Sequence, residues 1–519
     1  MDRVYIGTIY LDYTGRRVDW IRVSNGVVVD YGMSPPPEDA EVVALKGVLI
    51  PGFIDGHTHI FRYGLSLMWI DLRGVESIAE LKDRVREGMD RRFMGWILGR
   101  GWDQDKMVDG RYPNRLDLDD VSRDIPIYLK RVCGHIAVAN SKALEIAGID
   151  VDTEDPPGGL IDRDEDGVPT GVLRETAMAL VERHIPEPDT NTLMEAGIRG
   201  FEDVLRRGVT MVHLVSATPE EWRVLKRMKS EGRLNVRVRV YLDHRYLEWA
   251  VDSGLKMGDG DDMLRFMGIK IITDGSLGGR TAYLRKPYSD DTGNRGVEVV
   301  PLEELRRIVK DAFTNGFQLA IHGIGDGAID NILTALEEEV GMDVASRRDR
   351  IEHASIMPSD LIDRASRLGV HISTQPQFVT SDTWVVERLG RERSRYTYPL
   401  KTLIDSGLNV GFGSDCPVEV PDPREGIYAA VTRGVGEGNE LGLLTPGEKL
   451  SISEALRGYT IGASMMSHDD NIGMLEKGSP FDAVELSVDP FKSDPEDILH
   501  SRIYRVFVNG VIRFSTLDE

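Results

Sequence analysis

The feature that most constrains this chain is a regular alternation of short apolar strands with amphipathic helices from about residue 204 onward. Such alternation is typical of βα units, which build a parallel sheet. Helical segments at 302–316 and 328–340 separate several of the strands. The expected strands lie at 47–59, 208–215, 235–244, 266–274, 316–325, 349–354, 369–377 and 409–415. Eight parallel strands predict an α/β fold, a (β/α)8 barrel of the TIM type.

Two further parts of the chain fall outside this pattern. From His59 to Val209 is 150 positions, whereas one βα unit takes roughly 30–40 residues. A large insertion is therefore expected after the first barrel strand, covering the active-site face and containing an amphipathic helix with a solvated side at 76–92. Alternating strands with Asn-Gly turns at both chain ends predict one small β-sandwich, because neither end can close its own core. The expected parts are the sandwich, 1–50 plus 470–519, the barrel, 51–69 plus 204–469, and the insertion, 70–203.

Side chains that can bind metal stand at the ends of five predicted barrel strands. They are His57 and His59, Lys270, His322, His353 and Asp415. Active sites of such barrels form at these C-terminal strand ends. Two His at positions i and i+2 of a strand share one face, so one ion could bind both, and the whole nitrogen and oxygen set suits Zn²⁺ or a similar ion. Either His322 or His353 taken alone fits a core imidazole better, but four His and an Asp together favour a metal centre.

Longer motifs resemble the amidohydrolase superfamily of metal-dependent hydrolases. These motifs are PGFIDGHTH, HGIGD, RIEHA and GSDCPV. The segments GWDQDK, PNRLDLDD, GHIAVANSKAL, GVLRETA and IKIITDGSLGGRTAYL resemble the branch that includes N-substituted formamide deformylase. The resemblance covers about residues 40–510. It implies an amidohydrolase that acts on a carbon–nitrogen bond other than a peptide bond, in an amide or N-substituted formamide of a small molecule.

The resemblance also implies a role for each metal-binding position. His57 and His59 are expected to bind a first metal ion, and His322 and His353 a second. Asp415 is expected to ligate the first ion and to transfer a proton as the catalytic residue.

Lys270 is expected from the resemblance to be carboxylated by CO₂, so that its carbamate bridges two Zn²⁺ ions. The residues themselves leave another interpretation open. A lysine in an otherwise apolar strand is costly as a free ammonium unless it is paired. A salt bridge with Asp274 would supply that pair, although Asp274 also fits a role in the turn after the strand.

Three side chains are weaker candidates for substrate binding: His135, Trp102 and Arg280. Each has a structural alternative. His135 could bond backbone, Arg280 could hold its own loop, and Trp102 could be a core aromatic, as could Tyr283 and Phe378.

Two more residues lie close in sequence to predicted ligands. Asp326 could orient a metal-binding side chain through a hydrogen bond, or it could cap a helix. Cys416 follows Asp415 but has no assigned base, so we expect it to pack in the core rather than act as a nucleophile.

Charge and cysteine content restrict the partners. The chain has 63 Lys and Arg against 86 Asp and Glu, a net charge of −23, which argues against nucleic acid and anionic membranes as partners. Two cysteines form no disulfide framework, and the N-terminus lacks the pattern of a signal peptide, so a cytoplasmic location is expected.

We expect a small-molecule substrate, with a homodimer as an open possibility. Rival functions are deamination or ester or cyclic-amide hydrolysis at the same site, and a catalytically silent binding protein.

Overall fold

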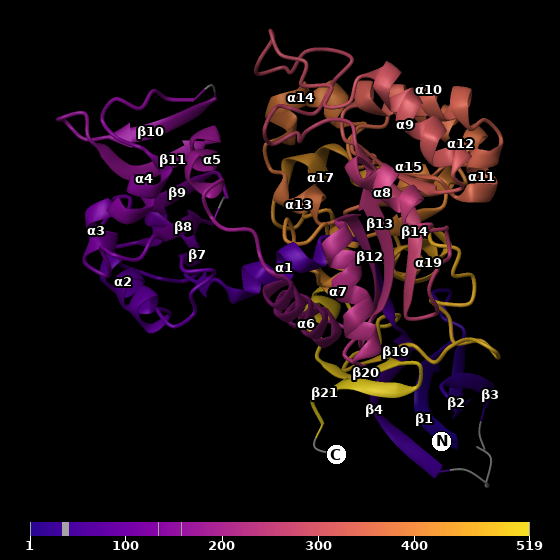
Figure 1. The fold of residues 1–519 in the computed structure, drawn as a ribbon. Helices are drawn as coiled ribbons and strands as arrows, with labels where there is room; N and C mark the ends of the chain where they lie inside the picture. Colours follow the sequence, from indigo (N-terminus) through magenta and orange to yellow (C-terminus); the bar gives the residue numbers. More distant parts are fainter. Residues whose placement is uncertain (1, 34–40, 133, 157, 518–519) are drawn as a thin grey trace. The chain divides into compact units, whose positions relative to one another are not determined.

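The chain forms two compact units in the computed structural model, which describes residues 2–33, 41–132, 134–156 and 158–517. One unit consists of Met1–Ile60 with Phe201–Glu519, and the other is Phe61–Gly200. The first unit contains the barrel and the sheet made by both chain ends, and the second contains the segment between the first two barrel strands (Figure 1).

The barrel is a sheet of eight parallel strands in the first unit. In sheet order they are β5 (Phe53–Thr58), β12 (Val209–Ala217), β13 (Arg237–Asp243), β14 (Leu264–Ile272), β15 (Gln318–Gly323), β16 (Arg350–His353), β17 (His371–Thr374) and β18 (Val410–Phe412). A parallel bridge between Thr58 and Cys416 joins the last strand to the first. At this seam Asp415 N donates to His57 O (2.8 Å), and His59 N donates to Cys416 O (2.9 Å). The predicted (β/α)8 barrel is confirmed.

Helices follow the barrel strands along the chain. They are α7 (Pro219–Ser230), α8 (Leu247–Asp252), α9 (Leu302–Thr314), α10 (Asp326–Glu339), α11 (Asp343–Arg347), α12 (Ser359–Leu368), α13 (Phe378–Ser381), α14 (Val385–Ser394), α15 (Leu400–Asp405), α16 (Pro423–Thr432), α17 (Glu440–Leu444), α18 (Ile452–Arg457) and α19 (Ala463–Met465). The expected helices at 302–316 and 328–340 correspond to α9 and α10. In α9 the residues Leu305, Ile308, Val309 and Ala312 are buried. Their spacing places them on one face of the helix, which explains why α9 packs as an amphipathic helix.

Both ends of the chain share one seven-stranded sheet (Figure 1). Its order is β21 (Val511–Ser515), β20 (Ile503–Val508), β19 (Ala483–Leu486), β4 (Glu41–Pro51), β1 (Asp2–Tyr10), β2 (Arg17–Ser24) and β3 (Val27–Gly32), with α20 (Pro495–Leu499) between β19 and β20. The ring of Tyr5 packs 5.2 Å from that of Phe481 and 5.3 Å from that of Phe507. The N- and C-terminal strands thus build a common core, as the sequence predicts.

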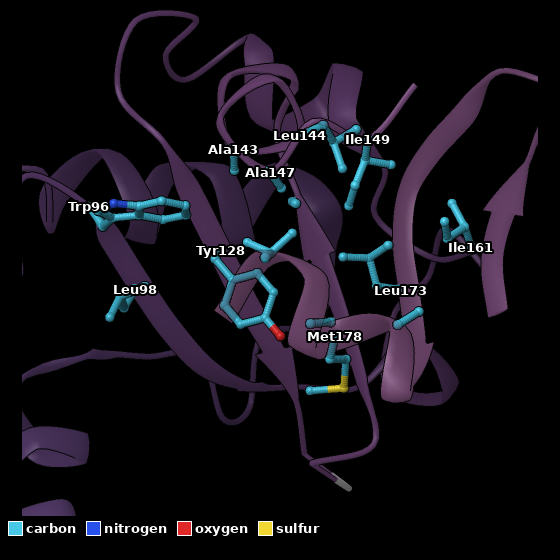
Figure 2. Packing of buried hydrophobic residues seen from close by; sticks show 14 of the residues in the cluster. Trp96, Leu98, Tyr128, Ala143, Leu144, Ala147, Ile149, Ile161, Leu173 and Met178 are labelled. Atoms are coloured by element: carbon cyan, nitrogen blue, oxygen red, sulfur yellow. The ribbon is translucent and has the colours of Figure 1, made fainter. Parts of the chain in front are cut away.

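The second unit contains a six-stranded sheet with a core on each face. Its order is β10 (Gly159–Arg163), β11 (Pro169–Glu175), β9 (Ile136–Ala139), β8 (Ile127–Arg131), β7 (Ile97–Trp102) and β6 (Ile70–Asp71). Leu98 and Tyr128 belong to one apolar cluster, shown in Figure 2. Their neighbours Ile97 and Leu129 belong to the other. Successive strand residues point to opposite faces, so both faces of this sheet are covered.

Six helices accompany this sheet in the described part of the chain. They are α1 (Ile60–Met68), α2 (Ile78–Glu87), α3 (Arg115–Asp119), α4 (Ser141–Ala147), α5 (Ala179–Glu182) and α6 (Thr190–Arg206), the first and last of which cross the unit boundary. The helix expected at 76–92 begins after Ser77, whose side chain accepts from Glu80 N, and ends at Gly88. Across the described residues, no helix combines the length and apolarity needed to cross a membrane.

Candidate metal centre

Closure of the barrel brings three metal-binding side chains together. His57 lies in β5, His59 follows that strand, and Asp415 lies just beyond β18. One ligand atom from each of them lies within 4.8 Å of the others. Asp415 Oδ1 is 3.3 Å from His57 Nε2 and 3.2 Å from His59 Nε2. Two imidazoles and a carboxylate that share one point form a plausible donor set for a divalent ion.

The hydrogen-bonding state of His57 supports this interpretation. Its Nδ1 contacts Glu352 Oε2 inside the protein. Although burial opposes ionisation, Arg350 and Lys270 hold the pKa of Glu352 well below its usual range. An ionised carboxylate can only accept, so the ring donates from Nδ1. Nε2 faces the Asp415 carboxylate at 3.3 Å, and either a proton on Nε2 or a metal ion can lie between these two atoms.

His322 and His353 lie beside this group. The ring of His353 is 4.4 Å from that of His322 and 4.8 Å from that of His57. His353 Nδ1 donates to Gln375 Oε1 (2.8 Å), which leaves Nε2 as an acceptor. Burial, together with the neighbouring His322, lowers the pKa of His353 well below its ordinary value, so the ring is neutral. A neutral imidazole is the form that binds metal.

Lys270 in β14 is buried, with 1% of its surface exposed. Its Nζ has no hydrogen-bond partner in the part of the chain that the structure describes. Burial lowers the pKa of Lys270 to about 8. A buried amine of this kind needs either a counter-ion or a chemical change that gives it partners.

Asp274 does not supply that counter-ion. Its carboxylate accepts from the backbone N of Tyr283 (2.9 Å), Ile324 (3.1 Å) and Gly325 (2.8 Å). Among the described residues, no ion pair joins Asp274 to Lys270. The salt-bridge interpretation of Lys270 is therefore wrong, and Asp274 organises the loop after its strand.

The backbone at the metal-binding residues is unusual. Asp415 has φ +56° and His353 has φ +70°. Few residues other than glycine adopt this left-handed region, and such conformations persist where the surrounding structure enforces them. Each of these residues lies where the chain leaves a barrel strand, beside the candidate metal centre.

Trp102 and His135 belong to the second unit. Trp102 is fully buried, and its Nε1 donates to Leu129 O (3.0 Å). Its indole is therefore packed in the core, and the expected contact of Trp102 with substrate is wrong. His135 is exposed, and its Nδ1 lies 3.0 Å from Glu175 Oε2. Its expected contact with substrate stays a prediction.

Arg280 and Asp326 hold loops in the first unit. Arg280 forms an ion pair with Asp290 (2.7 Å), so its observed partner is a carboxylate of the same loop. Asp326 begins α10, and its Oδ1 accepts from Arg285 N (2.9 Å). Of the two roles expected for Asp326, its place at the start of α10 is nearer to the helix-cap alternative, and its carboxylate also holds the 275–300 loop. Cys416 is buried, and burial raises the pKa of its thiol well above the ordinary value, which fits the expected packing role.

Sequence reasoning missed Glu352 and Gln375, the hydrogen-bond partners of two histidines. A signal for Glu352 was present, because Arg350 and Glu352 alternate in a short strand flanked by apolar residues. Opposite charges on one face of a buried strand indicate an ion pair in the protein interior. Gln375 follows β17 without a comparable pattern. Phe378 stacks on the ring of His353, with 6.4 Å between the ring centroids.

A closed (β/α)8 barrel with His-x-His at its first strand and a ligating Asp after its eighth defines a class of metal-dependent hydrolases. The model of the amidohydrolase family matches residues 41–514. The chain belongs to the amidohydrolase family.

Three relatives show how far this similarity extends. The protein YtcJ of Bacillus subtilis (strain 168) is 32% identical over 515 residues, 96% of each chain. N-substituted formamide deformylase of Arthrobacter pascens is 27% identical over 495 residues, 92% of this chain and 90% of the relative. A crystal structure of an uncharacterized metal-dependent hydrolase from Pyrococcus horikoshii OT3 has 35% identity and a TM-score of 0.82, and the match covers 96% of this chain and 99% of that one.

Proposed function

We propose that this amidohydrolase cleaves a carbon–nitrogen bond other than a peptide bond, in an amide or N-substituted formamide of a small molecule. Two divalent ions, with Zn²⁺ as the expected metal, would be held by His57, His59 and Asp415 and by His322 and His353. The observation that carries the proposal is the convergence of His57 Nε2, His59 Nε2 and Asp415 Oδ1. The relative named N-substituted formamide deformylase supports the substrate class.

Asp415 is the proton carrier of the proposed reaction. When bound, a divalent ion supplies Lewis acidity, which lowers the pKa of water from about 15.7 to about 7. Asp415 Oδ accepts the proton of the attacking water and then donates it to the leaving nitrogen, acting as general base and then as general acid. The hydrogen bond to Glu352 fixes the ring of His57 for this step. His59 lies beside it as the second expected ligand of the same ion.

Lys270 is proposed to bridge the two ions as a carbamate. The neutral Nζ would attack the carbon of CO₂, so that an N–C bond forms, one C–O π bond opens onto oxygen and an N–H proton passes to water. The product is an anion that can bind metal with both oxygens. The buried, unpartnered Nζ supports this step, because a carbamate removes the cost of a lone ammonium in the barrel.

The substrate class can be tested on protein reconstituted with Zn²⁺ or Mn²⁺. We would measure bound metal by elemental analysis and then screen N-formyl, N-acyl and cyclic amides for hydrolysis. About two ions per chain and turnover of formyl or acyl amides would support the proposal. Release of ammonia from amidines or turnover confined to esters would indicate the rival reactions. Full metal content with no turnover of any substrate would favour a silent binding protein.

Lys270→Ala tests the carbamate. We expect loss of one or both ions and of activity. The remaining His ligands are neutral, so they leave the positive charge of the ions poorly balanced. Formate or acetate should partly restore metal content and activity by entering the space of the missing side chain. Normal metal content and activity without added acid would contradict the carbamate and indicate a single-ion site.

A further inference from the structure

A buried pair of opposite charges lies directly behind the first metal-binding histidine. Arg350 and Glu352 alternate along β16, and both are fully buried. Arg350 Nε lies 2.5 Å from Glu352 Oε1. The other oxygen, Glu352 Oε2, contacts Nδ1 of His57. Glu352 therefore joins the buried cation to a predicted metal ligand.

Arg350 is itself held by three other barrel strands. Its Nη1 lies 2.7 Å from His213 Nδ1, and its Nη2 donates to Gly56 O (3.2 Å). The centre of the guanidinium lies 4.4 Å from the ring centroid of Tyr241. These contacts come from β12, β5 and β13, so the guanidinium cannot turn away from Glu352 without breaking several of them.

In the second metal-binding region the two histidines differ: His322 Nε2 lies 3.2 Å from Asp274 Oδ1, whereas His353 has an uncharged partner. His353 Nδ1 donates to Gln375 Oε1, a neutral amide oxygen. An ionised carboxylate raises the basicity of the imidazole that donates to it, and it also fixes the tautomer and the orientation of the ring. The Nδ1 atoms of the two histidines therefore have different hydrogen-bond acceptors: a carboxylate for His57 and an amide oxygen for His353.

We infer that Glu352, fixed by Arg350, is a positioning residue that sets the tautomer of His57 and strengthens the first metal site. It acts through His57 and touches neither substrate nor the reacting atoms. Because Glu352 contacts His57, its loss should weaken the site that His57 forms with His59 and Asp415. The inference rests on the proposed metal centre, and it adds a role in metal affinity for Glu352 and Arg350.

Glu352→Gln tests the inference, since it keeps the shape of the side chain and removes its charge. We expect the affinity for the first equivalent of Co²⁺ or Zn²⁺, measured by competition with a chelator, to fall by about 10–100-fold. The visible spectrum of the first bound Co²⁺ should change, because the orientation of His57 in the coordination sphere is no longer fixed. Glu352→Asp keeps the charge but draws the carboxylate back from the ring, and it should weaken the first site as well.

A double variant guards against a folding defect. Glu352→Gln alone leaves Arg350 without its anion in the core, which could prevent folding. Combined with Arg350→Met, the substitution removes both charges and retains an apolar side chain of similar length. If Glu352→Gln does not fold, the double variant decides: weakened first-metal binding supports the inference, and binding equal to that of the wild type overturns it.

Asp482→Asn provides a matched control. Asp482 is also buried and pairs with a barrel arginine, Arg237 (2.5 Å), yet both residues lie outside the metal-binding set. We expect lower thermal stability in this variant but unchanged affinity for the first metal. Equal weakening of first-metal binding in Asp482→Asn and Glu352→Gln would show a merely structural effect and overturn the inference.

A wild-type protein that binds no divalent ion would refute both the proposed metal centre and the inference. Normal first-metal affinity in a folded Glu352→Gln would refute the inference alone.

Discussion

In the proposed reaction, Asp415 both holds metal and transfers a proton. Its Oδ1 lies 3.3 Å from His57 Nε2 and 3.2 Å from His59 Nε2, which places it at the candidate metal centre. His57 and His59 are tied to the backbone of the same seam as Asp415. Ligation and proton transfer can therefore be separated by changing the chemistry of Asp415 while its shape is kept.

Asp415→Asn makes that separation. The amide keeps one ligand oxygen but cannot accept the proton of the attacking water. We expect activity to fall by about 10²–10⁴-fold, the range for loss of a general base, while the His ligands retain metal. Steady-state kinetics and elemental analysis of the same preparation check both statements. Near-normal turnover would place the proton carrier elsewhere.

Asp382 supplies a prediction on pH. Burial and the nearby Glu419 raise its pKa to about 7, even though the hydroxyl of Tyr398 donates to its carboxylate (2.5 Å). The folded state therefore binds more protons than the unfolded state from about pH 4 to about pH 7. The stability that this group contributes is complete below that window and is lost as the pH rises through it.

Asp382→Asn removes this dependence, because an amide does not ionise and its oxygen still accepts from Tyr398. The Tm of the variant relative to the wild type should rise between pH 5 and pH 8. Asp363→Asn, at an exposed position of α12, should show no comparable trend. A Tm difference for Asp382→Asn that stays constant across this range would refute the raised pKa.

Among the elements, the seam between β18 and β5 decides whether the centre forms. Gly413 follows β18, and a Cβ at this position would lie 2.5 Å from His57 N and 3.0 Å from Asp55 Oδ1. Asp55 in turn accepts from the backbone N of Ser414 (2.9 Å) and of His57 (3.2 Å). The strands approach so closely here that only glycine fits.

Gly413→Ala should therefore push the two strands apart. We expect a loss of about 1–3 kcal/mol in the free energy of unfolding, the usual cost of overpacking, together with weaker metal binding because His57 must shift. Denaturant unfolding and metal competition measure the two effects. Gly436→Ala is the control, since a Cβ there would have no atom within 4 Å. Unchanged metal affinity in Gly413→Ala would show that the seam tolerates a wider spacing.

At the scale of the whole molecule, the two units carry separate cores. The predicted metal-binding residues all belong to the first unit, while the second unit packs its own sheet between two apolar clusters. A cavity in the second unit should consequently weaken that unit and leave the metal centre intact.

Leu173→Ala tests this independence. Leu173 is fully buried in the cluster of Figure 2, and truncation of such a leucine costs about 2–5 kcal/mol. Amide hydrogen exchange should accelerate in peptides from 61–200, with metal content unchanged. Leu160→Ala, in the same unit but 47% exposed, should have little effect. Loss of metal in Leu173→Ala would show that the units depend on each other.

The sequence alone predicted the barrel, the common core of the two chain ends and a set of candidate metal-binding positions. Strand and helix periodicities are local, and parallel strands of one sheet end at a common edge, so residues such as His57 and Asp415 could be brought together from sequence position alone. The helix at 76–92 was predicted too long, because Gly88 ends it at Glu87.

Only the tertiary structure decided which side chains meet and which are covered. Glu352 contacts His57 across 295 positions of the chain, and this contact depends on the register with which the barrel closes. Trp102 proved to be a core residue and Lys270 an unpaired amine, because exposure and pairing follow from packing among distant segments. Strand ends can be predicted from local pattern, but the partners of a buried charge are set by every element that surrounds it.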